Sequence, residues 1–224
     1  MAPAPVDLLA RTAGGVLAAG TSALGAARQR IKPLHPEGRL RHATLTRTPG
    51  AMPSGVPWLD APGEDAAVVR VSRGIGLPDA LPDIQGLAIR LLLDGREADL
   101  LLASTGLGRL TRYVLTPTRK PAGRALTSLL PYRSPRGALL LAAVPEPGHG
   151  FELRWAGPVG PWHTFGRLDL GAAYGDDLAV SFDPVVNVLP GLSHYSWVRL
   201  LREPAYWAAR TRSGRTVRPS RASA

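Results

Sequence analysis

Short segments that alternate apolar and polar residues, each bounded by a turn signal, recur along most of this sequence. Several such segments at regular spacing are typical of an antiparallel β-barrel or β-sandwich. They cover residues 39–48, 66–72, 86–93, 98–104, 137–144, 151–156 and 167–170. The dipeptide Asp94-Gly95 predicts a tight turn that joins two of them into a hairpin. We expect residues 112–116 to continue the sheet and residues 123–131 to form a short helix.

Helical patterns lie at the two ends of the chain. Residues 5–30 space their leucines as a helix would, although Gly14, Gly15 and Gly20 weaken this prediction. Residues 204–212 predict a closing helix with a proline in its first turn. The polar, basic tail 213–224 is expected to be disordered. The predicted fold class is therefore α+β, with strands in the middle of the chain and helices at its ends.

Charge and cysteine content exclude several classes of function. The net charge is +10, but only Lys32 and Lys120 are lysines, and the abundance of Arg, Ala, Gly and Pro indicates a coding bias more than a nucleic-acid partner. The chain has no cysteine, which excludes disulfides, thiolate metal sites and a cysteine nucleophile, and fits a cytoplasmic protein. The uncharged stretch 12–27 is short for a membrane span, so none is expected.

An Arg-x-x-x-Tyr pair near the C-terminus, Arg202 and Tyr206, is a candidate for binding a metal ion. Residues four apart on a helix lie on the same face. A cation beside a tyrosine lowers the pKa of the phenol and favours the phenolate, which is a suitable ligand for ferric iron in haem. The pair follows Phe182–Pro184 and Asn187–Gly191, which gives the order F-D-P…N-x-x-P-G…R-x-x-x-Y.

This order resembles the C-terminal part of the domain found in the catalase family. The resemblance implies that Tyr206 is the axial ligand of haem b iron and that Arg202 supports its phenolate. A second segment, residues 32–38, is similar to the family's H-A-K-G motif. It implies that His35 is the acid–base group that moves a proton between the two peroxide oxygens, a task for which imidazole is suited near neutral pH. Lys32 and Leu34 would then contact the haem, Lys32 at a propionate.

A third segment is the most specific. Residues 69–72 (V-R-V-S) and 83–90 (D-I-Q-G-L-A-I-R) resemble the family's V-R-F-S and D-x-x-G-x-A-[VI]-[KR]. The resemblance implies that Arg70 binds a haem propionate, a role that suits a bidentate guanidinium. It also implies that Ser72 accepts a hydrogen bond from the distal histidine and fixes its tautomer.

Residues 99–108 depart from the family at two important positions. They resemble a strand and loop of the form D-L-V-G-N-N-T-P-x-F, in which the asparagine and the phenylalanine face the peroxide. Ala103 and Gly108 stand at those positions here, while Ser104 and Thr105 keep hydroxyl groups nearby. We therefore expect a wider pocket that lacks the amide donor.

Taken together, the resemblance implies a catalase-like antiparallel β-barrel with peripheral helices. We expect an N-terminal helical extension at 1–31, a haem-binding domain at 32–212 and a tail at 213–224. The expected activity is peroxide-dependent oxidation of an organic substrate: peroxidase, peroxygenase or hydroperoxide conversion. A haemless barrel that acts only as a binding module is the alternative, and a homo-oligomer is possible under either hypothesis.

Overall fold

The structure, a computed structural model, describes residues 37–48, 50–78, 80–120, 123–148, 150–176 and 180–200. The chain divides into two units, one of which is His35–Tyr195; the other combines Met1–Leu34 with Ser196–Ala224. Each unit is considered by itself, and nearly all described residues belong to the first. In the second unit, residues 196–200 are helical.

Strands dominate the described part of the first unit. In chain order its elements are β1 (Glu37–Arg47), α2 (Pro57–Asp60), β2 (Gly63–Arg73), β3 (Gln85–Leu93), β4 (Arg96–Ser104), the 3₁₀ helix η1 (Thr111–Tyr113), β5 (Leu126–Thr127), β6 (Tyr132–Ser134), β7 (Gly137–Glu146), β8 (Gly150–Ala156), β9 (His163–Asp176) and β10 (Ser193–His194).

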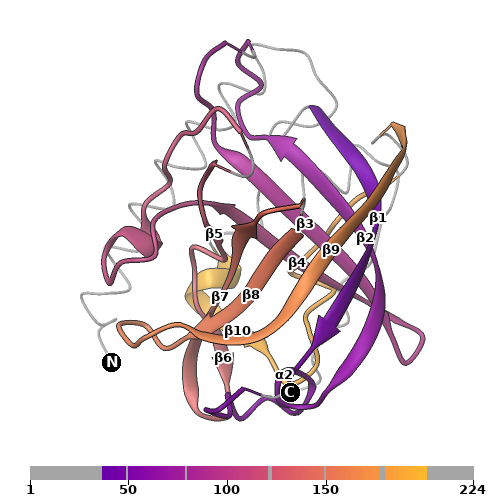
Figure 1. Cartoon of the computed structure of the whole chain (residues 1–224). Helices are drawn as coiled ribbons and strands as arrows, with labels where there is room; N and C mark the ends of the chain where they lie inside the picture. The colour runs from indigo at the N-terminus through magenta and orange to yellow at the C-terminus, as the bar shows by residue number, and fades with distance from the viewer. Residues whose placement is uncertain are drawn as a thin grey trace. The chain divides into compact units, whose positions relative to one another are not determined.

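Eight of these strands close into an antiparallel barrel (Figure 1). Around the ring they follow the order β7–β5–β4–β3–β2–β1–β9–β8, and β8 pairs again with β7. The two remaining strands lie beside the ring, where β6 pairs with β7 and β10 pairs with β6. The predicted antiparallel barrel is therefore confirmed, and the sandwich is wrong.

The α+β class is only loosely supported, because the described part is mostly β. Its helices are the four-residue α2, the three-residue η1 and the helical residues 196–200. The helices predicted at 5–30 and 204–212 lie outside the described residues, as does the tail at 213–224. The predicted domain limits at 31 and 212 stay predictions.

The hairpin of β3 and β4 shows how local sequence sets the register. Asp94 and Gly95 have φ of 49° and 74°, the left-handed conformation at both central residues of a type I′ turn. The turn fixes the pairing of Arg90 with Asp99 and of Gly86 with Ala103. The predicted hairpin is confirmed, down to its turn residues.

Two local predictions are wrong. Residues 111–113 form η1 and do not continue the sheet, because the guanidinium of Arg112 is held by backbone carbonyl groups of two loops. Residues 123–131 contain the short strand β5 instead of a helix. β5 pairs with β4 on one side and with β7 on the other, so the ring closes through these two residues.

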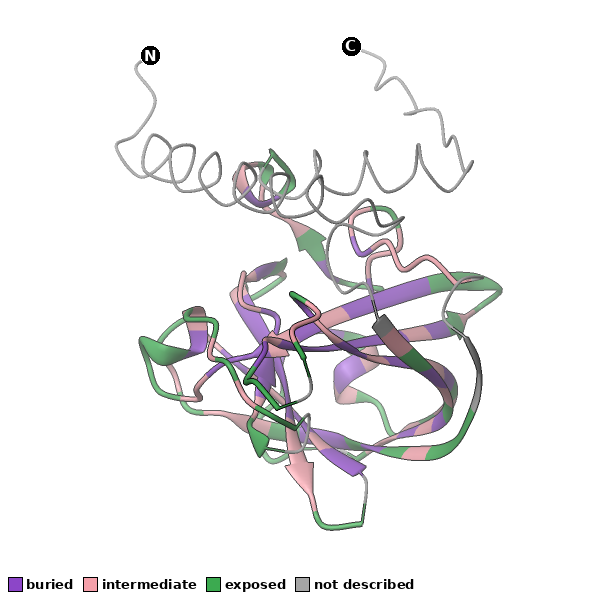
Figure 2. Ribbon diagram, turned by 90° about the horizontal axis from the view of Figure 1, so that it is seen from above, coloured by how far each residue is buried: buried purple, intermediate pink, exposed green. Residues whose placement is uncertain are grey.

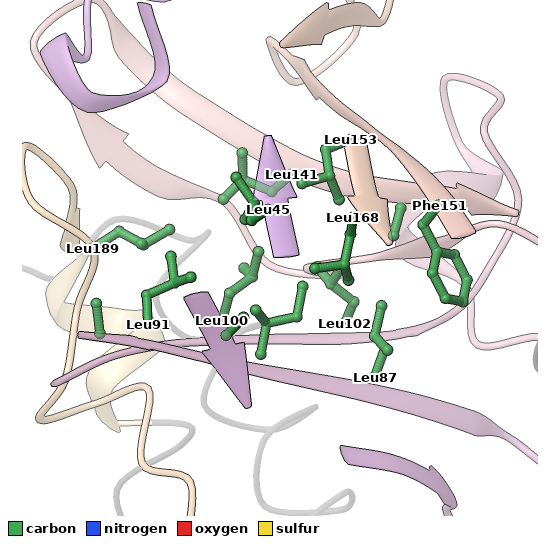
Figure 3. Close-up of a cluster of buried hydrophobic side chains, with 14 of the residues drawn as sticks. Leu45, Leu87, Leu91, Leu100, Leu102, Leu141, Phe151, Leu153, Leu168 and Leu189 are labelled. Atoms are coloured by element: carbon green, nitrogen blue, oxygen red, sulfur yellow. The ribbon is translucent and has the colours of Figure 1, made fainter. Parts of the chain in front are cut away.

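Leucines fill the inside of the barrel (Figure 3). Leu45, Leu100, Leu141, Leu153 and Leu168 come from five different strands and point toward one another. Each is at most 4% exposed, and burying such a side chain stabilises the fold by about 1.5–3 kcal/mol. An eight-stranded barrel is just wide enough for side chains to fill, so the interior leaves the outside of the barrel as the place for a ligand.

Parts of the outer face are buried as well. Five consecutive residues of β3, 85–89, are buried, and so are residues 139–143 of β7. Uninterrupted burial means that both faces of a strand are covered, whereas a strand with one wet face would alternate. Figure 2 shows these long buried stretches in purple.

Candidate functional site

A row of small side chains crosses the outer face of the barrel. Its members, from one cross-strand partner to the next, are Gly38, Ser72, Gly86, Ala103 and Thr127. On four of the five strands a neighbouring residue belongs to the core or packs against it (Val71, Leu87, Leu102 and Leu126), so the row faces away from the core. Neighbouring strands lie about 4.8 Å apart, so this small-residue row offers a long surface with few protruding atoms.

A second row of residues runs beside it and contains a positively charged side chain. It consists of Leu40, Arg70, Ala88 and Leu101. Arg70 is only 6% exposed. Its guanidinium lies against Gly38, where an added Cβ atom would be 2.6 Å from Nε and 2.7 Å from Cζ. Glycine at position 38 thus makes room for the Arg70 side chain on the small-residue row.

Positions that the sequence assigned independently meet on this face. Ser72 and Ala103 both pair with Gly86, on its two sides, and Arg70 lies two residues before Ser72 on the same face of β2. The structure therefore brings together Arg70, Ser72 and the position of the missing asparagine. Their roles toward a ligand stay predictions.

The hydroxyl groups next to Ala103 are already engaged. The hydroxyl of Ser104 accepts a hydrogen bond from the amide of Gln85 at 3.0 Å and donates to the carbonyl of Thr116 at 2.7 Å. Thr105 hydrogen-bonds to the hydroxyl of Thr127 at 3.0 Å, and Thr127 donates to the carbonyl of Arg112 at 2.9 Å. Neither Ser104 nor Thr105 replaces an amide donor at position 103.

Gly108, the position matched to the family's phenylalanine, lies in an exposed turn. Its amide donates to the hydroxyl of Thr111 at 3.0 Å. An added Cβ atom would meet only that hydroxyl, at 2.9 Å. The residue that could narrow a pocket is therefore absent at both of the positions that the sequence singled out, Ala103 and Gly108.

The sequence did not predict an ion pair that joins the hairpin to the C-terminal motif. Arg90 donates to both carboxylate oxygens of Asp99, at 2.7 and 2.6 Å, and the Asp99 side chain is fully buried. Burial alone would lower the pKa of Arg90, but the hydrogen bond with Asp99 and the negative charges of Asp99, Glu97 and Asp183 together outweigh it and raise the pKa. Both residues are equally far from the Asp94-Gly95 turn, which is the signal that could have revealed the pair.

This ion pair holds the segment that contains F-D-P and N-x-x-P-G. Asp99 accepts from the amide of Asp183 at 2.7 Å and from the side-chain amide of Asn187 at 2.9 Å. Arg90 donates to the carbonyl of Ser181 at 2.7 Å, and its guanidinium lies 5.1 Å from the ring centre of Phe182. The two motifs, far apart in sequence, are thus parts of one structural anchor.

Asp83, the first residue of the D-x-x-G motif, has a structural role too. Its carboxylate is fully buried and accepts from the amides of Ile75, Gly76, Leu77 and Ile84, at 2.7–3.0 Å. It therefore shapes the loop between β2 and β3. Its hydrogen bonds explain why this position takes an acidic residue without any catalytic role.

The remaining predicted site residues cannot be placed. His35, Lys32, Leu34, Arg202 and Tyr206 all lie outside the described residues. Among the described residues, no group of three or more His, Cys, Asp or Glu side chains is arranged to hold a metal ion. No helix in the same residues is long and apolar enough to cross a membrane.

Comparison with solved structures identifies the fold as catalase-like. A structure described as that of a bacterial catalase matches with a TM-score of 0.58 and 11% sequence identity. The match covers 83% of this chain but only 57% of that one, so the chain spans little more than half the length of its structural relative. The sequence matches no family model and no curated protein sequence. At this identity the likeness shows the fold alone.

Proposed function

We propose that the chain is a haem-dependent oxidoreductase that uses peroxides and oxidises or rearranges an organic substrate. The observation that carries the proposal is the outer face of the barrel, where a row of small residues runs beside the buried Arg70. The catalase-like fold supports it, because the barrel places on one face the positions that the sequence resemblance had matched separately.

The described residues fit a flat, acidic cofactor. Gly86 and Ala103 present little more than backbone and would let a planar ring lie close to the sheet. Arg70 supplies a buried cation next to them, which suits a propionate because a guanidinium can bind a carboxylate bidentately. Ser72 adds a hydroxyl group on the same face.

Residues from outside the described part would complete the binding of haem. In this proposal Tyr206 is the iron ligand, Arg202 keeps its phenol deprotonated, and Lys32 and Leu34 contact the macrocycle. When bound, the haem iron supplies the electrons that break the peroxide O–O bond. The protein holds the cofactor, orients the peroxide and moves its proton.

His35 would do the proton transfer. It precedes Gly38 by three residues, so the chain itself limits the distance between their Cα atoms to about 11 Å. Its imidazole would take the proton from one peroxide oxygen and return it to the other. The hydroxyl of Ser72, paired with Gly38 across the strands, would accept from the other ring nitrogen and hold the required tautomer.

Ala103 predicts which peroxides react well. A dismutase must orient two small peroxide molecules in turn, and one lost hydrogen-bond donor can cost roughly 100- to 1,000-fold in rate. Ser104 and Thr105 cannot supply the donor, because their hydroxyl groups bind Thr116 and Thr127. We therefore propose weak dismutation of hydrogen peroxide and better turnover of bulkier peroxides or organic donors.

Two rates, each measured per haem, test this proposal: oxygen evolution from hydrogen peroxide, and turnover of an organic hydroperoxide with a phenolic donor. We expect the first to be low in the wild-type protein and to rise at least about tenfold in Ala103→Asn. Ala66→Asn is the matched control, since Ala66 is exposed on the same face of β2 but outside both rows. Oxygen evolution at the level of an ordinary catalase, with negligible organic turnover, would contradict the proposal.

A haemless binding module is the second candidate, and the missing donor at Ala103 is the observation that favours it. In that case the small-residue row would bind a flat apolar ligand without chemistry. A preparation that takes up no haem when haem is supplied would favour this second function.

A further inference from the structure

We propose that two loops on the outside of the barrel form a docking surface for an anionic lipid membrane. The loops are residues 106–116, which include η1, and residues 157–162, between β8 and β9. Together they are called the loop pair below. This proposal is independent of the haem and goes beyond the proposed function.

A buried arginine locks the two loops together. Arg112 is 2% exposed and donates to the carbonyls of Leu107 and Gly108 in its own loop, and to those of Gly157 and Gly160 in the other. These contacts are 2.9–3.3 Å long. The loop pair therefore behaves as one rigid surface, with few backbone groups left to reorganise.

Two further side chains cross between the loops. The indole of Trp162 donates to the carbonyl of Leu107 at 2.8 Å, and its ring lies 4.7 Å from the guanidinium of Arg112. The hydroxyl of Tyr113 donates to the carbonyl of Pro158 at 2.7 Å. Val114 directly follows Tyr113 and Val159 directly follows Pro158, so each loop has an exposed residue next to this contact in the sequence.

Those neighbours are aliphatic and exposed. Leu110 is 80% exposed, Val114 is 56% and Val159 is 62%. Single exposed aliphatic residues are ordinary, but three of them on two loops that hydrogen bonds hold together favour a contact with another apolar phase or molecule. Loop tips of this kind lose unfavourable contact with water when they enter the headgroup region of a bilayer.

The charge of the surrounding chain fits an anionic surface. Between Asp99 and Glu146 the sequence has seven basic residues and no acidic one. Four of the seven are exposed near the loop pair in sequence and form no ion pair with any described residue: Arg109, Arg119, Lys120 and Arg124. Each basic residue at an anionic membrane adds about 1 kcal/mol of attraction.

Exposed aliphatic residues together with exposed basic residues favour a membrane over the other partners that a basic surface can bind. Phosphates of a nucleic acid would use the arginines but would leave Leu110 and Val159 in water. A second copy of this chain would bring a second set of arginines against the first. An anionic bilayer takes up both the aliphatic tips and the cations, so it is the partner that accounts for all of them.

Vesicle flotation with the full chain tests the proposal. We expect binding to vesicles of phosphatidylcholine mixed with phosphatidylglycerol, little binding to phosphatidylcholine alone, and weakening by salt. The double variant L110E/V159E should bind the mixed vesicles at least about tenfold more weakly. Leu92→Glu is the control: Leu92 is 68% exposed but lies on β3, outside the loop pair, so its replacement should leave vesicle binding unchanged.

Variants that remove positive charges test whether vesicle binding depends on the basic residues near the loop pair or on those at the ends of the chain. Arg109→Gln with Lys120→Gln should weaken binding roughly fivefold for each charge removed. The control pair Arg96→Gln with Arg133→Gln also removes two exposed positive charges, but neither belongs to the four basic residues named above, so this variant should bind like the wild type. Thermal melts of all variants check that they fold, which the exposure of the replaced side chains leads us to expect.

Three outcomes would overturn the proposal. The first is no binding of the wild type to the mixed vesicles. The second is equal binding by the wild type and L110E/V159E, because the membrane contact would then lie elsewhere. The third is a wild-type dimer in size-exclusion chromatography that L110E/V159E converts to a monomer, because the loop pair would then join two copies of the chain.

Discussion

At the scale of single residues, the buried charges of this protein connect segments that are far apart in sequence. Asp83 shapes the loop before β3, Asp99 holds residues 183–187 beside β4, and Arg112 joins two loops. Each satisfies several hydrogen bonds, as buried polar groups must. Two of the three are acids within family-like motifs, so matching a motif does not by itself make a residue a reacting group.

The Asp99 connector predicts a large effect on stability. Asp99→Asn removes the carboxylate that binds Arg90 and leaves the guanidinium, which is 12% exposed, without its closest partner. Breaking such a buried pair costs about 3–5 kcal/mol. Urea unfolding measures the loss. Asp169→Asn is the control, because its ion pair with Arg167 is half exposed on both sides and should contribute little to stability. Equal losses in the two variants would show that Asp99 is not an anchor.

The ionised side chain of Glu152 should make a small contribution to the stability of the fold, and this contribution should depend on pH. The hydrogen bond from Arg154 lowers the pKa of Glu152 below its usual 4.5, with burial opposing and the hydroxyl of Thr164 adding to the effect. A lowered carboxyl pKa stabilises the fold above 4.5, and this stabilisation is lost as pH falls through the folded-state pKa. Glu152→Gln should therefore be less stable than the wild type near neutral pH, by less than about 1 kcal/mol, and this gap should close in acid. A gap that widens in acid would contradict this assignment.

At the scale of strands and turns, the sequence predicts correctly the elements that depend on residues close together in the chain. The strands at 66–72, 86–93 and 98–104 follow from alternation and from the Asp94-Gly95 turn, and they were predicted correctly. Residues 112–116 look equally strand-like. Residues 111–113 form η1 instead, because Arg112 finds carbonyl partners near residue 160, and no local pattern contains that information.

The short strand β5 also depends on residues that are distant in the sequence. Residues 123–131 have a helical composition, but the gap between β4 and β7 in the ring requires a strand there. The candidate face was predictable residue by residue, since Arg70 and Ser72 were identified from the sequence. That Ala103, Gly86 and Ser72 lie on one line depends on the register of three strands, which only the structure provides.

The positive φ of Gly95 in the β3–β4 turn predicts a loss of stability when this glycine is replaced. Gly95 has φ of 74° and no atom within 4 Å of an added Cβ, so Gly95→Ala should cost about 1 kcal/mol through the backbone alone. Gly157→Ala is the matched control, because it also meets no atom within 4 Å but has no positive φ. We expect unfolding experiments to show a loss for the first and little change for the second. The reverse order would mean that the turn is not type I′.

At the scale of the whole molecule, the inside and the outside of the barrel differ in their side chains. Its leucine-filled interior provides the stability, and its outer face presents a row of small residues with Arg70 beside it. The Arg90–Asp99 anchor fixes the segment that precedes the C-terminal residues.

The central claim is that this chain binds haem through Tyr206. The most direct measurement is the absorbance spectrum of the full chain after expression with supplied haem, compared with Tyr206→Phe and with Tyr113→Phe as a tyrosine control in the loop pair. We predict a Soret band for the wild type and for Tyr113→Phe, and its near-complete loss in Tyr206→Phe, which lacks the anionic ligand oxygen. A wild type without a Soret band, or a Tyr206→Phe variant with full haem content and an unchanged spectrum, would contradict the claim.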